Sequence, residues 1–480
     1  MFDVIIIGCG VVGAASAFEL SKYRLNVLVL EKENDVAMGA TRANSAIIHA
    51  GYDPEPGTLM AKLNVEGSRM AETLCKRLSV PYIRNGALVL GFSEEDECTI
   101  RTLYERGNQN GVEGLQILSA GEVRAKEKHV SDKAVMALYA PSSAIVDPWE
   151  YALAFAEVAA ANGVSFRFSE KVSSIERSKS GYTVVTANGR FETKYVINAA
   201  GVHSDEVHDM VAAREFSIKP VRGDYCVLDK CENAKAHCTL FQCPSKEGKG
   251  VLVTPTVHGN LLVGPDAVSC GDRDRVNTTA ESIAFIKKKA EKSVPDIDYR
   301  STIRQYAGMR ANSDRQDFVI GFAQEHFLDL AGIKSPGLSA APAIAKEAAR
   351  LLYEDGLTLI KNPNATEERK KIRFKELSED EKKKLIEKDP LYGRVICRCE
   401  TVTEGEIVHA LRSPLPPRTL DGVKRRVGTG MGRCQGGFCG PKVVEILARE
   451  WKISPLQVLR DAEGSYILAG ETKEDADNEL

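Results

Sequence analysis

Four cysteines near the end of the chain have the number and spacing of a metal-binding set. Cys397 and Cys399 form a Cys-x-Cys pair, and Cys434 and Cys439 form a second pair after an interval of 34 residues. Four thiolates are the ligand set of a [2Fe–2S] cluster or of a structural zinc ion. Zinc more often uses Cys-x2-Cys pairs, so this spacing favours iron. The pattern predicts a metal or cluster site, and four unrelated thiols are the alternative.

A second group of cysteines lacks such a spacing. It comprises Cys226, Cys231, Cys238 and Cys243. The intervals between them match no common ligand pattern, and buried thiols on strands are frequent in proteins. We interpret this group as structural and leave it outside the predicted sites.

The start of the chain carries glycines and an acid at the spacing of a dinucleotide-binding turn. Gly8, Gly10 and Gly13 form a Gly-x-Gly-x-x-Gly motif, and Glu31 lies 18 positions after the last glycine. The first glycine allows a tight turn, the second lets a pyrophosphate approach the backbone, and the third lets helix and strand pack closely. The acid is placed to bind a ribose hydroxyl. These residues predict a dinucleotide site.

The elements around the glycines are those that such a motif needs. Val4–Ile7 is a continuous apolar run, which is typical of a buried parallel strand, and it leads directly into the motif. Small and apolar residues from Ala14 to Leu20 predict a helix, and Val27–Leu30 predicts a second strand that ends on the acid. Because strand, helix, strand and acid follow in order, a chance glycine turn is the weaker interpretation.

Periodicity predicts further elements along the chain. They are a strand at Tyr82–Leu90, a charged helix at Glu94–Asn110, alanine-rich helices at Pro148–Asn162 and Ala340–Tyr353, and β-like runs between residues 218 and 299. Residues 362–389 are dominated by Lys, Glu and Asp, which favours a solvated helical linker. The acidic residues 471–480 predict a disordered tail.

The length and the net charge of the chain limit the classes of protein to which it can belong. A chain of 480 residues exceeds one hydrophobic core, and 64 basic against 67 acidic side chains give a net charge of −3. This balance gives no reason to expect nucleic acid as a partner. No apolar run is long enough to span a membrane, and the first strand leaves no room for a signal peptide, so we expect a cytoplasmic protein without direct membrane insertion. Twelve cysteines then indicate metal or redox work rather than disulfides.

The loop after the second strand has a more specific pattern. It contains Thr41, Asn44, Ser45, His49 and Gly51 among small and polar residues. A surface loop with one histidine is the alternative interpretation. The segment resembles the flavin-contacting segment of the FAD-dependent D-amino-acid-oxidase superfamily, in the form found in glycerol-3-phosphate and L-2-hydroxyglutarate dehydrogenases. The resemblance extends over residues 1–355.

The cysteine segment carries a second resemblance. Val395–Glu400 and Gly430–Gly440 are similar to the ferredoxin-like [2Fe–2S] domain related to bacterioferritin-associated ferredoxin. Anaerobic glycerol-3-phosphate dehydrogenases carry this domain at the same end of the chain. The resemblance implies that the four cysteines 397, 399, 434 and 439 bind a [2Fe–2S] cluster. Glycines beside them would free backbone N–H groups to bond the sulfurs.

The two resemblances together imply an α/β fold. A Rossmann-like FAD-binding domain would contain an inserted α+β substrate domain, and a small [2Fe–2S] domain would follow. The implied boundaries are 1–80, 140–217 and 300–360 for the discontinuous FAD-binding domain, 81–139 and 218–299 for the substrate or cap domain, 361–393 for the charged linker, 394–455 for the [2Fe–2S]-binding domain and 456–480 for the C-terminal tail.

The family resemblance also implies which residues hold FAD. They are Gly8, Gly10, Val12, Gly13, Glu31, Lys32, Thr41, Asn44, Ser45, Val172, Ala200, Gly201, Gly332, Ser335, Gly337 and Leu338. The backbone of Val172 would meet the adenine edge. The N-terminus of the helix predicted from residue 340 could stabilise negative charge on a reduced flavin.

Three residues are implied in catalysis by the same resemblance. A hydride would pass to the flavin while a base takes the substrate's hydroxyl proton, and His49 is the candidate base, or orients the substrate, or only contacts FAD. Arg310 matches the family's substrate-anion arginine, for which a surface salt bridge is the alternative. Lys334 could reach a phosphate as a point charge.

The resemblance leaves the substrate open between two small dianions. Lys334 and the cluster domain favour sn-glycerol 3-phosphate, oxidised to dihydroxyacetone phosphate, whereas Ser335-Pro336 departs from that pattern. L-2-hydroxyglutarate is the alternative. No second βαβ motif is present for a nicotinamide cofactor, so electrons should come from the organic substrate. They should leave through the cluster to an additional electron-transfer subunit or another acceptor than oxygen. A non-catalytic electron-transfer subunit is an alternative of another class.

Overall fold

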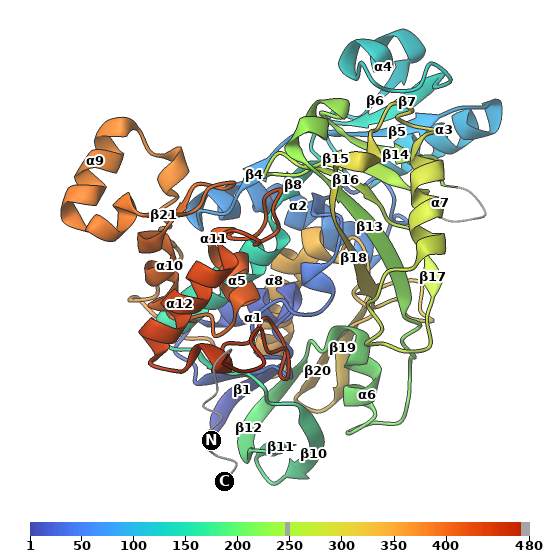
Figure 1. Cartoon of the computed structure of the whole chain (residues 1–480). Helices are drawn as coiled ribbons and strands as arrows, with labels where there is room; N and C mark the ends of the chain where they lie inside the picture. Colours follow the sequence, from blue (N-terminus) through green and yellow to red (C-terminus); the bar gives the residue numbers. More distant parts are fainter. Residues whose placement is uncertain (245–249, 472–480) are drawn as a thin grey trace, which may run out of the picture. The chain divides into compact units, whose positions relative to one another are not determined.

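The computed structural model describes residues 1–244 and 250–471, which Figure 1 draws in colour along the sequence. The chain forms two compact units. The larger comprises Met1–Lys32 and Val36–Arg369, and the smaller comprises Glu33–Asp35 and Lys370–Leu480. The acidic tail predicted to be disordered, residues 471–480, lies outside the described residues except for Glu471.

The first sheet of the larger unit has the predicted βαβ unit at its centre. Its eight strands run in the order β10-β11-β12-β1-β2-β9, with β20 paired to β12 and β19 to β20. The central pairs β12–β1, β1–β2, β2–β9 and β12–β20 are parallel. The strands are β1 (Phe2–Ile7), β2 (Val27–Leu30), β9 (Ser165–Arg167), β10 (Val172–Ser178), β11 (Gly181–Thr186), β12 (Gly189–Asn198), β19 (Val319–Gln324) and β20 (Phe327–Ala331).

Alanine-rich helices pack together beside this sheet (Figure 1). Helix α1 (Val11–Leu20) packs against α5 (Pro148–Ala161) and α8 (Gly337–Glu354), and α8 packs against α2 (Leu59–Arg77). Small side chains allow the close approach, since a Cβ added at Gly67 in α2 would lie 2.1 Å from the Ser339 carbonyl oxygen in α8. Both predicted alanine-rich helices are confirmed, and α8 begins three residues earlier than expected.

The second sheet of the larger unit is mixed, and it includes the β-like runs expected between residues 218 and 299. Its nine strands run in the order β17-β13-β16-β15-β14-β5-β7-β6, with β18 on the other edge of β13, and only β14–β5 is parallel. The strands are β5 (Ala87–Gly91), β6 (Gln116–Ser119), β7 (Met136–Ala140), β13 (Val221–Leu228), β14 (Thr239–Gln242), β15 (Leu252–Pro255), β16 (Leu261–Gly264), β17 (Val268–Ser269) and β18 (Thr302–Arg310). Helices α3 (Glu94–Gln109), α4 (Ala120–Lys126) and α7 (Ala280–Ala290) accompany it.

The single strand predicted at Tyr82–Leu90 is wrong. The segment forms β4 (Tyr82–Ile83), which pairs with β8 (Ala144–Val146) in a small sheet with β3 (Ile47–Ile48), and then β5 in the nine-stranded sheet. Gly86 separates the two strands with φ of +72°, a left-handed conformation that ends an extended run. Apolar residues on both sides of Gly86 conceal this break in the sequence.

The smaller unit has its own core. Strands β21 (Val395–Cys397) and β22 (Val402–Thr403) precede helices α10 (Glu404–Leu411), α11 (Leu420–Val427) and α12 (Gly440–Trp451). Buried apolar residues of these elements form one cluster that includes Cys397 and Cys439. Helix α9 (Glu379–Lys388) lies in the charged segment predicted as a helical linker and buries none of its residues.

Among residues 1–244 and 250–471, no helix has both the length and the hydropathy of a membrane span.

Candidate active site

The glycine turn between β1 and α1 has the close packing that its residue types predict. Gly8 has φ of +99°, and a Cβ there would lie 2.5 Å from the Ala199 carbonyl oxygen. A Cβ at Gly13 would lie 2.0 Å from the Gly8 carbonyl oxygen. Gly10 is the N-cap of α1, and a Cβ added there would meet only the Thr41 hydroxyl, at 3.3 Å. Gly8 and Gly13 therefore hold the turn together, whereas Gly10 leaves the helix N-terminus accessible to an anion.

The acid at the end of β2 faces this turn. The Glu31 carboxylate, which is 8% exposed, accepts a hydrogen bond of 2.6 Å from the Cys9 N–H. Beside it, the Glu170 N–H donates to the Glu31 carbonyl oxygen, and the buried Oε2 of Glu170 has no hydrogen-bond partner among the described residues. A buried carboxylate oxygen without a donor fits the hydroxyl of a bound ribose. The sequence prediction missed Glu170, which no motif marks.

Other predicted FAD residues surround the same end of the sheet. Val172 is the first residue of β10, and Ala200 and Gly201 follow β12, next to the residue whose carbonyl touches Gly8. The Lys32 ammonium instead forms an ion pair of 3.0 Å with Asp274. Thr41 accepts the Val11 N–H in a 2.9 Å bond, so it fixes the first turn of α1.

The loop predicted to contact flavin is shaped by its own side chains. The Asn44 amide donates to the carbonyl oxygens of Ala40 and Thr41 and accepts the Ala46 N–H. The loop contains a short 3₁₀ helix, Ala40–Arg42, and β3, rather than being irregular throughout. These hydrogen bonds of the Asn44 side chain hold the turn in place. A flat cofactor could then lie against the backbone beside the turn.

His49 and Ser335 meet although they are 286 positions apart in the chain. The His49 Nε2 lies 3.3 Å from the Ser335 hydroxyl oxygen, and the His49 N–H donates to the Ser339 hydroxyl at 2.7 Å. The imidazole ring also lies 5.7 Å from the Phe241 ring, measured between centroids. Helix α8 and its preceding turn thus position the histidine. Ser339 and Phe241 were not identified from the sequence.

The β13–β18 pair places a row of residues against the same loop. Opposite positions are Tyr225 with Tyr306, Gly223 with Gly308, and Val221 with Arg310. Alternation along a strand puts Tyr306, Gly308 and Arg310 on one face. That face touches the loop, because the Tyr306 hydroxyl donates to the Asn44 carbonyl oxygen at 2.8 Å.

Two tyrosines of this row were not singled out by sequence reasoning. The rings of Tyr225 and Tyr306 stack with centroids 4.7 Å apart, and the Tyr225 hydroxyl lies 3.2 Å from the Ser45 hydroxyl. Burial of the hydroxyl raises the pKa of Tyr306 well above its usual value, which keeps the phenol neutral. Only the register of β13 and β18 brings the two rings together, and a sequence does not reveal a register.

Arg310 lies at the end of this row and is half-buried. One of its guanidinium nitrogens donates to the Asp266 carbonyl oxygen at 2.9 Å, and a Cβ at Gly223 would come within 2.4 Å of the same nitrogen. Among the residues that the structure describes, Arg310 forms no ion pair. The surface salt bridge weighed as the alternative is therefore not seen. A half-buried guanidinium without a carboxylate partner suits an anionic ligand.

Lys334 lies in the turn between β20 and α8. It is half-buried, its N–H donates to the Gly332 carbonyl oxygen at 2.9 Å, and its carbonyl oxygen accepts the Gly337 N–H at 2.7 Å. Gly332 has φ of +62°, which this tight turn requires. The turn places Lys334 directly before Ser335, the residue that contacts His49.

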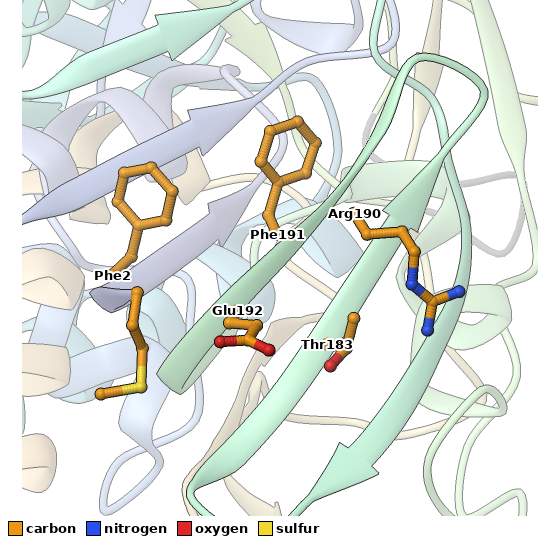
Figure 2. A pocket seen from close by; sticks show the side chains of 6 residues that line it. Phe2, Thr183, Arg190, Phe191 and Glu192 are labelled. Atoms are coloured by element: carbon orange, nitrogen blue, oxygen red, sulfur yellow. The ribbon is translucent and has the colours of Figure 1, made fainter.

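A surface hollow of about 510 Å³ lies elsewhere on the larger unit (Figure 2). Phe2, Thr183, Arg190, Phe191 and Glu192 line it together with Met1. Phe2 is the first residue of β1, whereas the glycine turn follows the last one. Ligands of open parallel sheets bind beyond the carboxyl ends of the strands. The hollow is therefore not the candidate site.

The four predicted cluster ligands come together in the smaller unit as two pairs. The Cys399 and Cys434 sulfurs are 3.7 Å apart and exposed, whereas Cys397 and Cys439 are buried. A hydrogen bond shared with Cys439 lowers the pKa of the Cys397 thiol to about 6. Within the described ranges, no three His, Cys, Asp or Glu side chains are arranged as a ready metal site.

Glycines complete the cysteine site. The Gly430 N–H contacts the thiols of both Cys397 and Cys439, and a Cβ at Gly432 would lie 2.3 Å from the Cys399 Cβ. Backbone N–H groups directed at sulfur stabilise thiolates. Four thiols with such donors fit a [2Fe–2S] cluster.

Comparison with known proteins identifies the class that this fold and these sites define. Residues 3–351 match the family described as FAD dependent oxidoreductase, and residues 395–449 match the BFD-like [2Fe-2S] binding domain. The first match spans more than half of the chain, so the protein belongs to the FAD-dependent oxidoreductase (DAO) family. The predicted fold class and the cofactors FAD and [2Fe–2S] are confirmed.

The chain is also similar to individual proteins of this family. A glycerol 3-phosphate dehydrogenase from Caloramator mitchellensis is 50% identical, over 98% of this chain and 99% of its own length. The structure of dithionite-reduced L-alpha-glycerophosphate oxidase from Mycoplasma pneumoniae with FAD bound has a TM-score of 0.73 and 34% identity, over 76% of this chain and 98% of its own. A mitochondrial L-2-hydroxyglutarate dehydrogenase from Bos taurus is 30% identical, over 72% of this chain and 87% of its own length.

Proposed function

We propose that this protein is an FAD-dependent dehydrogenase that oxidises sn-glycerol 3-phosphate to dihydroxyacetone phosphate. Electrons then pass through the [2Fe–2S] cluster to an acceptor other than oxygen. The observation that carries the proposal concerns Arg310. Its guanidinium is half-buried and forms no ion pair among the described residues. It lies on the face of β18 that contacts the loop predicted to bind flavin, residues 41–51. The full-length similarity to a glycerol 3-phosphate dehydrogenase supports the same substrate.

Charge explains why a phosphate suits this site. A phosphate monoester carries close to two negative charges near neutral pH. Arg310 offers a planar fork and Lys334 a point charge, and both are half-buried. In this proposal the two cations neutralise the phosphate together. Their partial burial strengthens the attraction relative to open water.

His49 is the proposed base for the reaction. When bound, FAD accepts the hydride that leaves the carbon beside the hydroxyl. His49 would take the hydroxyl proton at Nε2, the nitrogen that lies 3.3 Å from the Ser335 hydroxyl. The Ser339 hydroxyl accepts the His49 backbone N–H and so fixes the start of this side chain. The Phe241 ring lies beside the imidazole and the rings of Tyr225 and Tyr306 stack together, and in this proposal these rings would limit the entry of water.

Anaerobic reduction of the flavin tests the substrate directly. Purified holoenzyme is mixed separately with sn-glycerol 3-phosphate, L-2-hydroxyglutarate and glycerol, and loss of flavin absorbance is followed in a single turnover. We expect rapid reduction by sn-glycerol 3-phosphate and slow reduction by uncharged glycerol. Faster reduction by L-2-hydroxyglutarate would contradict the proposal.

L-2-hydroxyglutarate oxidation is the second candidate function. The 30% identity to the bovine enzyme over 72% of this chain favours it, and a dicarboxylate also needs a guanidinium such as Arg310. The two candidates differ in their dependence on Lys334, since a carboxylate suits the planar fork better than a point charge. Comparing both substrates in wild type and Lys334→Met separates them.

A further inference from the structure

The cluster site is asymmetric, and its exposed side carries a distinct patch. Cys399 and Cys434 are exposed, whereas Cys397 and Cys439 lie in the core of the smaller unit. Phe438 is directly before Cys439 and is 44% exposed, although it is a large apolar side chain. Its backbone N–H contacts the Cys434 thiol. An exposed aromatic residue therefore contacts, through its backbone, one of the two exposed predicted cluster ligands.

Two cations lie against this ring. The Arg398 guanidinium is 4.6 Å from the ring centroid and the Lys442 ammonium is 5.3 Å from it. Both side chains are exposed, as is Arg433 beside Cys434. We call Arg398, Phe438 and Lys442 the cation–phenyl patch. Cation–π contact at exposed sites contributes only about 0.5–1 kcal/mol, so the patch is not a major source of stability.

Within residues 370–471, carboxylates pair with other arginines of the smaller unit but not with the two cations of the patch. Arg394 pairs with Glu404, and Arg412 pairs with Glu450 at 3.1 Å. Within residues 370–471, which the structure describes, Arg398 and Lys442 form no ion pair. The unit thus neutralises arginines elsewhere on its surface, while the two cations of the patch stay available to a partner.

We propose that the cation–phenyl patch is the docking face for an acidic one-electron carrier protein that takes electrons from the cluster. This inference rests on the proposed function, in which electrons leave through the cluster. In each encounter the reduced cluster loses one electron and the oxidised carrier gains it, with no bond made or broken. Two encounters are needed for each substrate molecule, because a hydride carries two electrons.

The composition of the patch fits a brief complex with such a partner. Aromatic and arginine side chains are enriched in the centres of protein interfaces. Unpaired positive charge steers an acidic partner and raises its association rate, and salt suppresses this effect. The ring supplies an apolar contact next to the ligands, so the carrier would stop where the path to the cluster is shortest. A second copy of this chain has a net charge of only −3 and the same cations here, which disfavours self-association through the patch.

The test uses full-length holoenzyme reduced with a stoichiometric amount of dithionite, so that no organic substrate is involved. The reduced protein is mixed in a stopped-flow instrument with oxidised plastocyanin, an acidic carrier, or with cytochrome c, a basic one. We expect plastocyanin to react faster at low salt, with a rate that falls as salt rises. Cytochrome c should show the weaker or opposite salt dependence.

Matched variants locate the docking face. Arg398→Gln and Lys442→Gln should each slow plastocyanin reduction several-fold at low salt and little at high salt, whereas Arg412→Gln removes another exposed arginine of the same unit and should have no effect. Phe438→Ala should slow the reaction at all salt concentrations. The electron paramagnetic resonance spectrum of the reduced cluster confirms that each variant retains it.

Three outcomes would overturn the proposal. The first is equal behaviour of the two carriers, or of the Arg398 and Arg412 variants. The second is slower flavin-to-cluster transfer in the patch variants with unchanged carrier reduction, which would assign the patch to contact within the chain. The third is a monomer–dimer equilibrium that Phe438→Ala abolishes, which would make the occupant a second copy. None of these depends on the substrate, so failure here is distinct from failure of the glycerol 3-phosphate assignment.

Discussion

The Arg310 guanidinium donates to a carbonyl oxygen, and among the residues that the structure describes no carboxylate pairs with it. Arg369, for comparison, is buried between Glu150 and Glu157. Breaking a buried pair leaves an uncompensated charge and costs about 3–5 kcal/mol. Arg369 is therefore committed to structure, whereas Arg310 retains its charge for a ligand.

Removing either proposed phosphate cation should affect charged substrates selectively. Arg310→Gln and Lys334→Met should each lower kcat/KM for sn-glycerol 3-phosphate by the equivalent of about 2–5 kcal/mol, because one phosphate charge then lacks a partner. Reduction by glycerol, measured in the same single-turnover assay, should change little. An equal loss with both substrates would point to damaged structure instead of a lost charge.

The buried thiols of the nine-stranded sheet should be chemically inert. Burial raises the pKa of Cys226 to about 11 and those of Cys238 and Cys243 to about 12. At pH 8 their reactive thiolate fraction is then on the order of one in a thousand or less. Iodoacetamide at this pH should label the exposed Cys98 and Cys231 in the native protein, as mass spectrometry of peptides would show.

This experiment also tests the structural interpretation of the four-cysteine group. Labelling of the three buried thiols should require denaturation. Rapid native labelling of Cys238 or Cys243 would instead indicate an accessible thiolate with another role.

At the scale of elements, we expect two glycines of the turn between β1 and α1 to have different roles, one in the packing of the fold and the other in the approach of the cofactor. Gly13→Ala places a Cβ 2.0 Å from the Gly8 carbonyl oxygen, so α1 must move away from β1 and the protein should be destabilised. Gly10→Ala meets only the Thr41 hydroxyl, at 3.3 Å, so the fold should persist while a pyrophosphate loses its close approach. We expect Gly10→Ala to purify folded with little FAD, and Gly13→Ala to have a melting temperature lowered by several degrees.

Flavin content and thermal unfolding followed by circular dichroism check both halves of this prediction. If the Gly10→Ala protein purified with its full flavin content, the prediction that the pyrophosphate binds at this turn would be wrong. Gly13→Ala with wild-type stability would show that α1 has room to shift.

The elements that the sequence predicts well are those with strong local patterns. Strand Val4–Ile7, the glycines and Val27–Leu30 occur together and form a βαβ unit as predicted. The segment Tyr82–Leu90 has apolar residues at both ends but is divided at Gly86, because its two halves pair with strands of two different sheets. Local patterns do not show which partner strand is available.

The same limit applies to the site. His49 and Ser335 were both identified from the family pattern, but their 3.3 Å approach arises from tertiary structure. Tyr225 and Tyr306 meet only through the register of β13 and β18, and the orphan oxygen of Glu170 reflects burial. Motifs therefore reveal the residues whose backbone geometry is special, whereas side chains brought in by strand pairing need a structure.

At the scale of the whole molecule, substrate oxidation and electron export should be separable. Cys399 is an exposed predicted ligand, so Cys399→Ser should remove a thiolate without opening the core around Cys397 and Cys439. We expect this variant to lose the cluster signal and the ability to reduce a carrier protein. Its flavin should still be bleached by substrate, because the residues proposed for hydride transfer all lie in the larger unit.

Iron analysis and flavin absorbance measure the two parts independently. Zinc in place of iron after anaerobic purification would contradict the cluster assignment. Loss of flavin reduction together with the cluster would show that the two units do not act separately.

The distance along the chain between His49 and Ser335 has a consequence for biosynthesis. When the ribosome has synthesised the glycine turn and His49, it must still synthesise β20 and α8 before Ser335 can lie beside the histidine. His49 and Ser335 can therefore meet only after about three quarters of the 480 residues have been made, and contacts of such separation form slowly. The four predicted cluster ligands, in contrast, all lie between residues 397 and 439. We therefore expect flavin insertion to depend on long-range folding and cluster insertion to depend on a short local segment.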